Sequence, residues 1–495
     1  MSDLFGSALT TLGRKCEIDT HGGGGKTAPT IHADATARTR ATSVPALAGD
    51  VLGEGVAWPP PRPKRRREAP RTAEDVAESL RRKRRRYELT RVAGSVLHEK
   101  DTHWKEQHRT VWCHRGTHRT ADRPLPVYRT AVGTSARLAD VTTCGQGWTC
   151  PVCAAKITEH RRSELRIGME RHCGAGGGIY LVSLTLPHQA DQALEPLLLQ
   201  LLDASIRLKN CRKWKATMEA AGYVGAVKGL EVTVGLNGWH PHIHMLLLTN
   251  RGGLGEGAPN DEGDLSSRAI DTLKLEWVRL LLKVGAITQQ QASDTYKHGL
   301  NVRGGDKAAE YIAKYGEDQW GLAREVASLH AKIGVRGQHG GFHHFTPFQL
   351  LEIADAEGPY KQQARALFRE FAAAFKSRRM LTWSPGLKKH LGIAELDQPV
   401  PGEEFQVGEI THQQFSTLVR TNRVGAFIEY VAQECESIFI AQDLIDAFID
   451  RCSREHAARG SGEILTGVEW HGHYKQKEGM SRYQFQPEDH GSYTR

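Results

Sequence analysis

Three histidines occupy alternate positions in the segment LNGWHPHIHMLLLT, which spans residues 236–249: His240, His242 and His244. Because side chains alternate across a β-strand, all three imidazoles are expected on one face of the strand. The apolar run that follows them predicts that the strand continues into a hydrophobic core. A face of this kind either meets solvent or binds a metal ion, and imidazole is a common metal ligand.

An acidic residue on the preceding segment completes a candidate metal site. The segment YVGAVKGLEVTVG reads as a strand, and the LNG that follows it is a tight-turn signal, so the two strands are predicted to form a hairpin. In this hairpin Glu231 can turn towards His242 and His244. Two imidazoles and one carboxylate, with open coordination positions, suit a catalytic divalent ion. The alternative is a hairpin whose histidines face solvent.

A second candidate feature is a pair of tyrosines on a short helix. The segment DKAAEYIAKYG has Asp306 as a candidate N-cap and Gly316 as a stop signal. Tyr311 and Tyr315 are four residues apart and therefore share one helical face. A phenol has a pKa of about 10, so a tyrosine needs alignment and nearby positive charge to act as a nucleophile at neutral pH. Lys314 is a candidate helper; the alternatives are a packing pair and a solvated lysine.

A third feature is a group of cysteines. The segment CGQGWTCPVC contains Cys144, Cys150 and Cys153, and its C-P-x-C part is typical of zinc ligation. A closed structural zinc site needs a fourth ligand, for which Cys113 in VWCHRG is the best candidate. The other candidates for this position are histidines: His114, His118 and His160. The alternative to a zinc site is a set of reduced core cysteines.

The elements that must position these residues follow a regular order. They are predicted as a buried strand over 179–186, helices from residue 194 through 214, the two hairpin strands, a helix over 265–283 and a strand over 298–304. This β-α-β-β-α-β order predicts a ferredoxin-like α+β fold, an antiparallel sheet with helices on one face. The tyrosine helix follows the last strand and can then lean over the histidines.

The positive charge of the chain is concentrated near its start. Between residues 62 and 86 twelve Lys and Arg face four acidic residues, a net charge of +8 out of +9 for the whole chain. Such a cluster favours a DNA-binding arm that releases counterions from phosphates, and Arg65, Arg66, Arg84 and Arg85 are its predicted contacts. The alternative is a solvated tail.

These patterns divide the chain into four predicted regions. They are a disordered basic leader over 1–95, a cysteine-rich zinc module over 100–165, an α+β domain with a C-terminal extension over 175–395 and a helical region of unknown role over 396–495. No signal peptide and no apolar run long enough to span a membrane is found, which predicts a soluble cytoplasmic protein. Nine cysteines in a chain of this kind favour thiols or metal ligation over disulfides.

GWHPHIHMLLL, YIAKY and the earlier strand LVSLTL together resemble the HUH endonucleases, specifically the rolling-circle replication initiator (Rep) proteins of plasmids and single-stranded DNA phages. The resemblance runs from about Cys113 to Gly392, and the motifs stand in the order of these initiators. One-tyrosine plasmid initiators typically carry Glu four residues before the nucleophile. Here that position is Tyr311, which resembles the two-tyrosine class.

The resemblance implies a concrete mechanism. A divalent ion, Mg²⁺ or Mn²⁺, would bind His242, His244 and Glu231 and polarise the scissile phosphate of single-stranded DNA. Tyr315 or Tyr311 would attack this phosphate, giving a 5′-phosphotyrosine and a free 3′-OH. The other tyrosine would cut the regenerated origin later. Because the covalent link conserves the energy of the phosphodiester, strands would be rejoined without ATP.

The resemblance also implies partners. These are plasmid DNA, double-stranded at the origin and single-stranded at the nick, and the host helicase and replication machinery. Trp239 is a candidate for stacking on an unpaired base; the alternative is a tryptophan packed inside the hairpin. Two other functions are open: a two-tyrosine rolling-circle transposase, and a non-catalytic zinc-bearing regulator that binds duplex DNA without nicking it. The origin sequence and the oligomeric state stay open as well.

Overall fold

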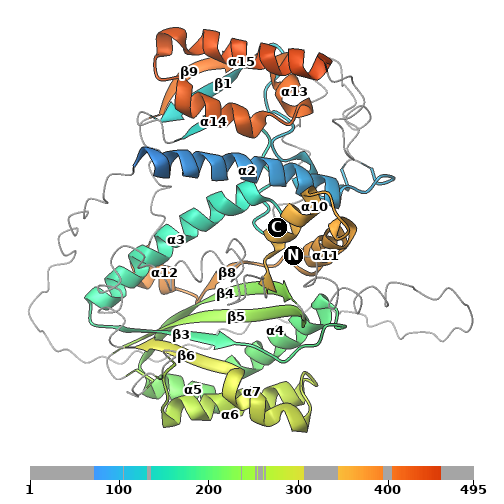
Figure 1. The fold of residues 1–495 in the computed structure, drawn as a ribbon. Helices are drawn as coiled ribbons and strands as arrows, with labels where there is room; N and C mark the ends of the chain where they lie inside the picture. Colours follow the sequence, from blue (N-terminus) through green and yellow to red (C-terminus); the bar gives the residue numbers. More distant parts are fainter. Residues whose placement is uncertain are drawn as a thin grey trace, which may run out of the picture.

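The computed structural model describes residues 72–458, apart from 104, 131–134, 236, 251–252, 255–259, 261–263, 306–343 and 394–403. These residues build two hydrophobic cores, a larger one around a six-stranded sheet and a smaller one around a three-stranded sheet. Figure 1 shows the long helix α2 (Ala73–Leu97) lying between them. Both sheets are antiparallel, so the described chain has a mixed α+β architecture.

The larger sheet is built on four long strands. They are β3 (Gly178–Leu184), β4 (Tyr223–Gly235), β5 (Gly238–Thr249) and β6 (Leu300–Gly305). Their spatial order is β6-β3-β5-β4, and every neighbouring pair is antiparallel. Two short strands, β7 (His344–Phe345) and β8 (Leu381–Trp383), also pair with β4. The predicted sequence of a strand, helices, two strands, helices and a strand is confirmed.

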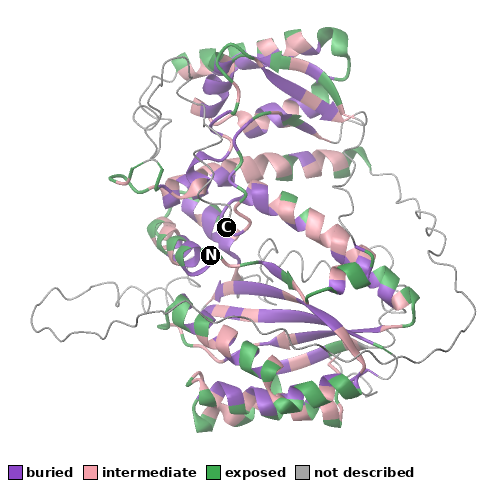
Figure 2. Ribbon diagram, turned by 180° about the vertical axis from the view of Figure 1, so that it is seen from behind, coloured by how far each residue is buried: buried purple, intermediate pink, exposed green. Residues whose placement is uncertain are grey.

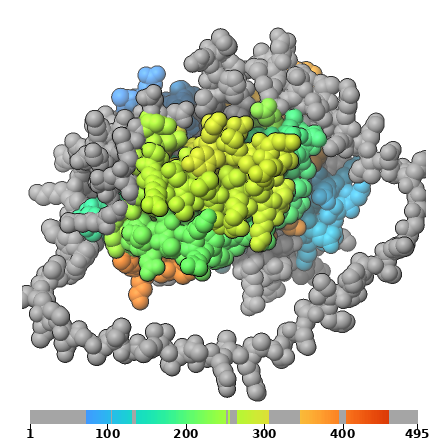
Figure 3. Space-filling model, turned by 90° about the horizontal axis from the view of Figure 1, so that it is seen from below, coloured from blue at the N-terminus to red at the C-terminus, as the bar shows by residue number. Residues whose placement is uncertain are grey.

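Helices cover one face of this sheet. They are α4 (Leu194–Asn210), α5 (Arg212–Ala220), α6 (Arg268–Lys283) and α7 (Ala292–His298), with the short 3₁₀ turn η3 (Gln289–Gln291) between the last two. Figure 3 shows this layer from outside. Helix α6 begins at Arg268, three residues after the predicted start, and the Ser267 hydroxyl caps it by accepting the Ile270 amide at 3.1 Å. Leu201 of α4 and Trp277 of α6 are fully buried in the same core as Met245 of β5.

Among the described residues, a second layer packs against the opposite face of the sheet. Helix α3 (Pro151–Gly174), β8 and α12 (Leu387–His390) contribute to a separate apolar cluster with strand residues such as Leu181, Leu246 and Leu248. Side chains alternate along β5, so His242 and His244 lie on this same face, beyond the apolar cluster. Figure 2 shows the buried strands between the two layers. One face of β5 therefore carries an apolar part and a polar part.

The smaller core joins segments that are far apart in the sequence. Its sheet has the order β2-β1-β9, with β1 (Leu125–Thr130), β2 (Ala136–Leu138) and β9 (Glu404–Ile410). Its helices are α13 (His412–Arg420), α14 (Val424–Glu434) and α15 (Ile438–Ala458), and α2 packs against them. The predicted boundaries at 100–165 and 396–495 are therefore wrong as separate units, because β9 pairs with β1. The last region is not purely helical either.

The prediction of a disordered leader up to residue 95 is also wrong, since residues 73–95 belong to α2. Thr72 and Asp75 form a capping box at its start. Leu80 is buried in the smaller core, whereas Leu89 and Val96 are buried in the larger one. The run of Arg and Lys between these positions hides the apolar spacing. Helix α2 thus contributes to both cores.

Three further elements complete the described structure: η2 (Arg109–Trp112), α10 (Pro347–Asp355) and α11 (Lys361–Ala374). Helices α10 and α11 pack on each other, and the aromatic side chains of α11 join the larger core. Among the helices of the described ranges, none has both the length and the apolar character that crossing a membrane requires.

Candidate functional site

Glu231, His242 and His244 come together on β4 and β5, the two strands of one hairpin. Glu231 lies directly opposite His242 in the β4–β5 register. The carboxylate Oε2 of Glu231 is 3.1 Å from His242 Nε2 and 3.2 Å from His244 Nε2. One ligand atom from each of the three residues lies within 4.8 Å of the others. The predicted set is therefore brought together with its donor atoms converging.

The far ring nitrogens of both histidines have partners that fix their orientation. Nδ1 of His242 is 3.3 Å from the His240 carbonyl oxygen, and Nδ1 of His244 is 2.9 Å from the Ser183 hydroxyl. When each Nδ1–H donates to its oxygen, the lone pair of each Nε2 points towards Glu231. Metal-binding histidines use outer partners of this kind to hold the ring and its tautomer. Ser183, on β3, was not predicted from the sequence.

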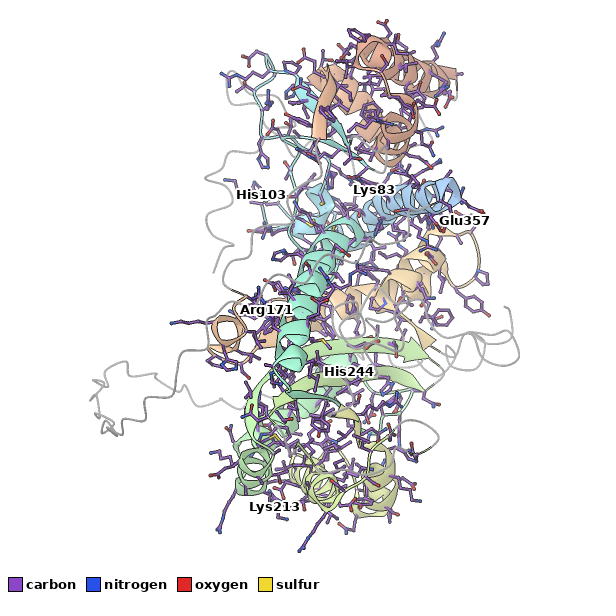
Figure 4. The ribbon with its side chains drawn as sticks, turned by 90° about the vertical axis from the view of Figure 1, so that its left-hand side faces the viewer. Lys83, His103, Arg171, Lys213, His244 and Glu357 are labelled. Carbon is purple, nitrogen blue, oxygen red and sulfur yellow. The ribbon has the colours of Figure 1, made fainter. Side chains whose placement is uncertain are left out.

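Burial makes this arrangement electrostatically demanding. Glu231 is 5 % exposed and His244 is 7 % exposed. A buried carboxylate is costly unless positive charge lies next to it, and here that charge comes from a proton on an imidazole or from a metal ion. Two nitrogens and one oxygen leave coordination positions open for water or substrate, as catalytic metal sites do. The three residues fit a divalent cation. Figure 4 labels His244 on the strand layer.

Trp239 does not take the role that the sequence prediction gave it. Its side chain is 1 % exposed, and its Nε1–H donates to Glu370 Oε2 at 3.0 Å. The other oxygen of Glu370 accepts the backbone amide of Leu194, the first residue of α4, at 2.8 Å. A ring held in this way cannot stack on a base. Trp239 instead ties the turn end of the hairpin to α4 and α11, which is the packing alternative.

The four predicted cysteines form a compact buried cluster. Cys113 Sγ lies 3.6 Å from Cys153 Sγ and 3.5 Å from Cys150 Sγ, and Cys144 Sγ lies 3.6 Å from Cys153 Sγ. In a tetrahedral site with Zn–S bonds of about 2.3 Å, neighbouring sulfurs are about 3.8 Å apart. Burial raises the pKa of the Cys150 thiol, whereas a coordinated cation deprotonates thiols. The cluster has the composition and dimensions of a zinc site.

Local structure supports this cluster. Cys150 caps the start of α3, where its sulfur accepts the Cys153 amide at 3.5 Å, and the Gln146 amide lies 3.4 Å from Cys144 Sγ. Thr90, from α2, places its hydroxyl 3.7 Å from Cys150 Sγ. The contact of Thr90 with the cysteines could not be predicted from the sequence, because Thr90 lies 60 residues before Cys150. The cysteine cluster therefore contacts the helix that joins the two cores.

The alternative histidine ligands do not belong to this cluster of four cysteines. The ring of His114 packs edge-on against Tyr87 at 4.9 Å between centroids, and burial lowers its pKa to about 4. His160 Nε2 lies 3.4 Å from Glu164 Oε1 on the outside of α3. The backbone amide of His118 donates to the Asp140 carbonyl oxygen. Cys113 is therefore the fourth residue of the group, as predicted.

The predicted DNA-contact arginines that the structure describes make intramolecular ion pairs. Arg84 pairs with Glu88 at 3.0 Å and with Glu429 at 3.3 Å. Arg85 pairs with Asp355 at 2.8 Å. These contacts attach α2 to α14 and α10, so Arg84 and Arg85 belong to a packed helix and not to a free arm. The other predicted residues lie outside the described residues: Arg65, Arg66, Tyr311, Lys314 and Tyr315.

Comparison with known proteins gives two relatives. A curated protein named "Protein rep", from Streptomyces lividans, is 28% identical over 316 residues, which cover 54% of this chain and 67% of that protein. The "Neomycin resistance protein" of Streptomyces cyanogenus is 33% identical over 159 residues, 27% of this chain and 36% of that protein. No family model and no solved structure matches the chain. Over about half of its length, the chain is thus similar to the Streptomyces lividans protein named "Protein rep".

Proposed function

We propose that this protein initiates plasmid replication by nicking DNA at the site formed by Glu231, His242 and His244. The observation that carries the proposal is the convergence of these three donor groups in a chain that is similar to a protein named "Protein rep". A metal ion bound there would act as a Lewis acid on a phosphodiester. The function that follows is metal-dependent, strand-specific cleavage at a replication origin.

The arrangement of strands supports the nuclease assignment. The order β6-β3-β5-β4, with antiparallel neighbours and helices α4 to α7 on one face, corresponds to the ferredoxin-like topology expected of HUH nucleases. The candidate metal ligands lie on the two strands of the β4–β5 hairpin, on the face of the sheet away from these helices. Single-stranded DNA would approach the site from the side of His242, which is half-buried, because Glu231 and His244 are buried.

The chemical step proposed is a transesterification by tyrosine. The phenolic oxygen of Tyr311 or Tyr315 attacks the phosphorus, the bond to the 3′ oxygen breaks, and that oxygen leaves with a proton as a free 3′-OH. Lys314, which precedes Tyr315 in the sequence, would supply positive charge to the attacking phenol. The phosphate stays on the tyrosine as a 5′-phosphotyrosine, and attack by a 3′-OH reverses the step. With both Tyr311 and Tyr315 present, one tyrosine can hold DNA while the other cuts.

The cysteine cluster has a structural role in this proposal. Zinc held by Cys113, Cys144, Cys150 and Cys153 would fix the start of α3 against α2. Because α2 contributes to both cores, this fixation would hold the smaller core against the larger one. The zinc-bearing part then orients the nuclease domain on DNA without taking part in cleavage.

The proposal is tested with the supercoiled circular DNA that encodes the protein. Purified protein and Mn²⁺ are added, the mixture is denatured, and protein linked to a 5′ end is isolated and the linked residue mapped. An adduct on Tyr311 or Tyr315 that is lost with a chelator is the expected result. The double variant Tyr311→Phe, Tyr315→Phe should form no adduct, whereas Tyr296→Phe, a control on α7, should behave like the parent.

Other outcomes would overturn this assignment. An adduct that survives in the double variant refutes the tyrosine assignment. Binding without any nicking refutes the nuclease proposal and favours the zinc-bearing regulator. Nicking only at the ends of a mobile element, with none at an origin, favours the transposase.

A further inference from the structure

One side of helix α3 is turned towards the sheet and carries two polar side chains. Thr158, Arg161, Leu165 and His172 follow one another at intervals of three, four and seven residues, so they lie on one side of the helix. Leu165 packs in the apolar cluster that contains Leu246 of β5, and His172 Nε2 lies 3.0 Å from the carbonyl oxygen of the last residue of β5. Thr158 and Arg161 therefore lie on the side of α3 that meets the sheet.

The contacts of α3 place Arg161 towards the part of β5 that carries the metal ligands. Figure 1 shows α3 descending from α2 to the strands. The four residues from Leu165 back to Arg161 advance about 6 Å along the helix, since each helical residue rises about 1.5 Å. The two residues from Leu246 back to His244 advance about 7 Å along the strand. Arg161 is therefore one helical turn closer to the level of His244 than Leu165 is.

Strand β8 gives the same placement across the sheet. Leu381, its first residue, belongs to the same apolar cluster as Leu165. In the sheet register Leu381 lies opposite Gly229 of β4, and Gly229 lies opposite His244 of β5. The side of α3 that carries Arg161 thus faces the row of strand residues to which His244 belongs.

Thr158 and Arg161 each have a buried polar atom that lacks a hydrogen-bond partner within the described chain: Oγ1 of Thr158 and Nη1 of Arg161. Arg161 as a whole is half-buried, so part of its side chain is still open to solvent. Burial lowers the pKa of Arg161 more than the neighbouring Glu164 raises it, but a guanidinium keeps its charge at neutral pH. The Glu164 carboxylate itself contacts Lys388 Nζ at 2.6 Å. Arg161 is therefore a partly desolvated cation with an unpaired donor.

Other arginines of α3 find their partners within the protein. Arg162 Nη2 lies 2.7 Å from Glu159 Oε1, and Arg171 Nη1 donates to the Leu391 carbonyl oxygen at 2.9 Å. Native proteins leave few buried donors unpaired, and each exception needs an explanation. For Arg161 the explanation that fits its charge is an anion that binds from outside the chain.

A phosphodiester is the anion that suits this pair of donors. Guanidinium groups bind phosphate oxygens in a fork, and Arg and Thr side chains are common contacts to the DNA backbone. Because Thr158 and Arg161 are neighbours on one side of α3, both can reach oxygens of one phosphate. The guanidinium stays protonated, so this contact does not depend on the protonation of the imidazoles on β5.

We propose that Arg161, assisted by Thr158, binds a backbone phosphate of the single strand that lies over Glu231, His242 and His244. This inference rests on the proposed nicking function and deepens it, because it assigns a DNA contact to α3, outside the metal set. The phosphate would give the unpaired donors their acceptors and hold the strand between α3 and the sheet. It also takes over the DNA contact that the sequence prediction assigned to Trp239.

The test uses Arg161→Met, which keeps a long side chain and removes the charge and the donors. Full-length variants are compared with the parent by fluorescence anisotropy, with labelled oligothymidylate and no divalent ion, at a series of salt concentrations. We expect Arg161→Met to weaken binding about 10–100-fold, the effect of losing hydrogen bonds to a charged group, and Thr158→Val about threefold. The slope of log K against log salt should fall by about 0.7 in Arg161→Met, the value for one phosphate contact with a single strand.

The matched control is Arg207→Met. Arg207 pairs with Asp203 at 2.9 Å on α4, which covers the other face of the sheet. It removes the same charge and should leave affinity and salt slope unchanged. Arg161→Lys keeps the charge, so it should keep the salt slope of the parent; a slope as low as that of Arg161→Met would overturn the inference.

Two further measurements separate this role from a structural one and from the metal site. Arg161→Met should not lower Tm in the absence of DNA, because it removes an unpaired buried donor; a lower Tm together with unchanged DNA binding assigns Arg161 to the fold and overturns the inference. Mn²⁺ affinity without DNA should not fall in Arg161→Met, and a loss would show that Arg161 acts through the metal ligands. A parent that never nicks origin DNA refutes the proposed function, whereas a parent that nicks while Arg161→Met binds DNA normally refutes only this contact.

Discussion

Replacement of Glu231 by glutamine tests the candidate metal site most directly. Glutamine has nearly the same shape as glutamate, but it carries no charge. In the parent, the Glu231 carboxylate lies 3.1 Å and 3.2 Å from two imidazole nitrogens in a buried position. Without a metal ion, the loss of a buried charge costs little stability, since burial disfavours the charged form. With a metal ion, the same substitution removes the only anionic group among the three ligands.

The expected loss of Mn²⁺ affinity follows from the role of Glu231 as the charged ligand. Loss of a group that merely orients a metal ligand lowers affinity 10–100-fold, so loss of a charged ligand is expected to lower it by about 100-fold, or about 2.7 kcal/mol. At an ion concentration 100 times the Kd of the parent, Mn²⁺ would stabilise the parent by about 2.7 kcal/mol and the variant by only about 0.4 kcal/mol. In a domain of 150–250 residues these values correspond to increases in Tm of roughly 5–10 °C and roughly 1 °C.

The assay is thermal unfolding at a series of Mn²⁺ concentrations, with affinity measured separately by calorimetry. Glu276→Gln provides the control, because Glu276 is also buried, at 2 % exposed, but pairs with Arg279 on α6. This control should lower Tm equally with and without Mn²⁺. If Glu231→Gln folds and binds Mn²⁺ within threefold of the parent, the ligand set is wrong.

Four further outcomes are expected. Ser183→Ala should lower Mn²⁺ affinity about tenfold by calorimetry without changing Tm in metal-free buffer, because only the orienting contact to one ligand is lost; an unchanged affinity would exclude that role. The purified parent should contain one zinc per chain by atomic absorption and Cys150→Ser none; full zinc content in the variant would contradict the cysteine site. Gly425→Ala should lower the free energy of unfolding by about 1–3 kcal/mol, because a methyl group there would lie 2.8 Å from Cβ of Tyr87 on α2. The control is Gly174→Ala, where a methyl group would meet nothing within 4 Å, and this variant should not be destabilised. Burial lowers the pKa of His108 to about 4 in the folded protein. As the pH falls below about 6.5, the imidazole of His108 is therefore protonated first in the unfolded chain, and the stability present above pH 6.5 is lost progressively down to pH 4. Urea unfolding of His108→Asn should show a weaker loss of stability over this range, and an identical loss would refute the assignment.

The metal set was predictable because its determinants are local. His242 and His244 follow the two-residue period of a strand, and the turn signal between the strands fixes Glu231 opposite His242. Ser183 was not predictable in the same way, because it belongs to a third strand whose pairing depends on the whole fold. The burial of Trp239 was within reach of the sequence: it alternates with His240 and therefore faces the helices.

Two other errors have physical causes. Helix α2 was predicted as disordered because its buried positions, such as Leu80, Leu89 and Val96, are separated by Arg and Lys that hide the apolar pattern. The smaller core was missed because β1 finds its partner β9 far along the chain. The local periodicity of a sequence cannot predict a pairing between strands that lie so far apart in the chain.

The pairing of β1 with β9 also sets the order of events during synthesis. Thr130 and Glu404 pair at one end of this ladder, yet the ribosome makes them 274 residues apart. At about 5–20 residues per second, strand β1 waits roughly 15–55 s for its partner. During that time the larger sheet can fold, while one edge of β1 stays open to other chains. Yield in the cell should therefore depend on how well this edge is protected before residue 404 emerges.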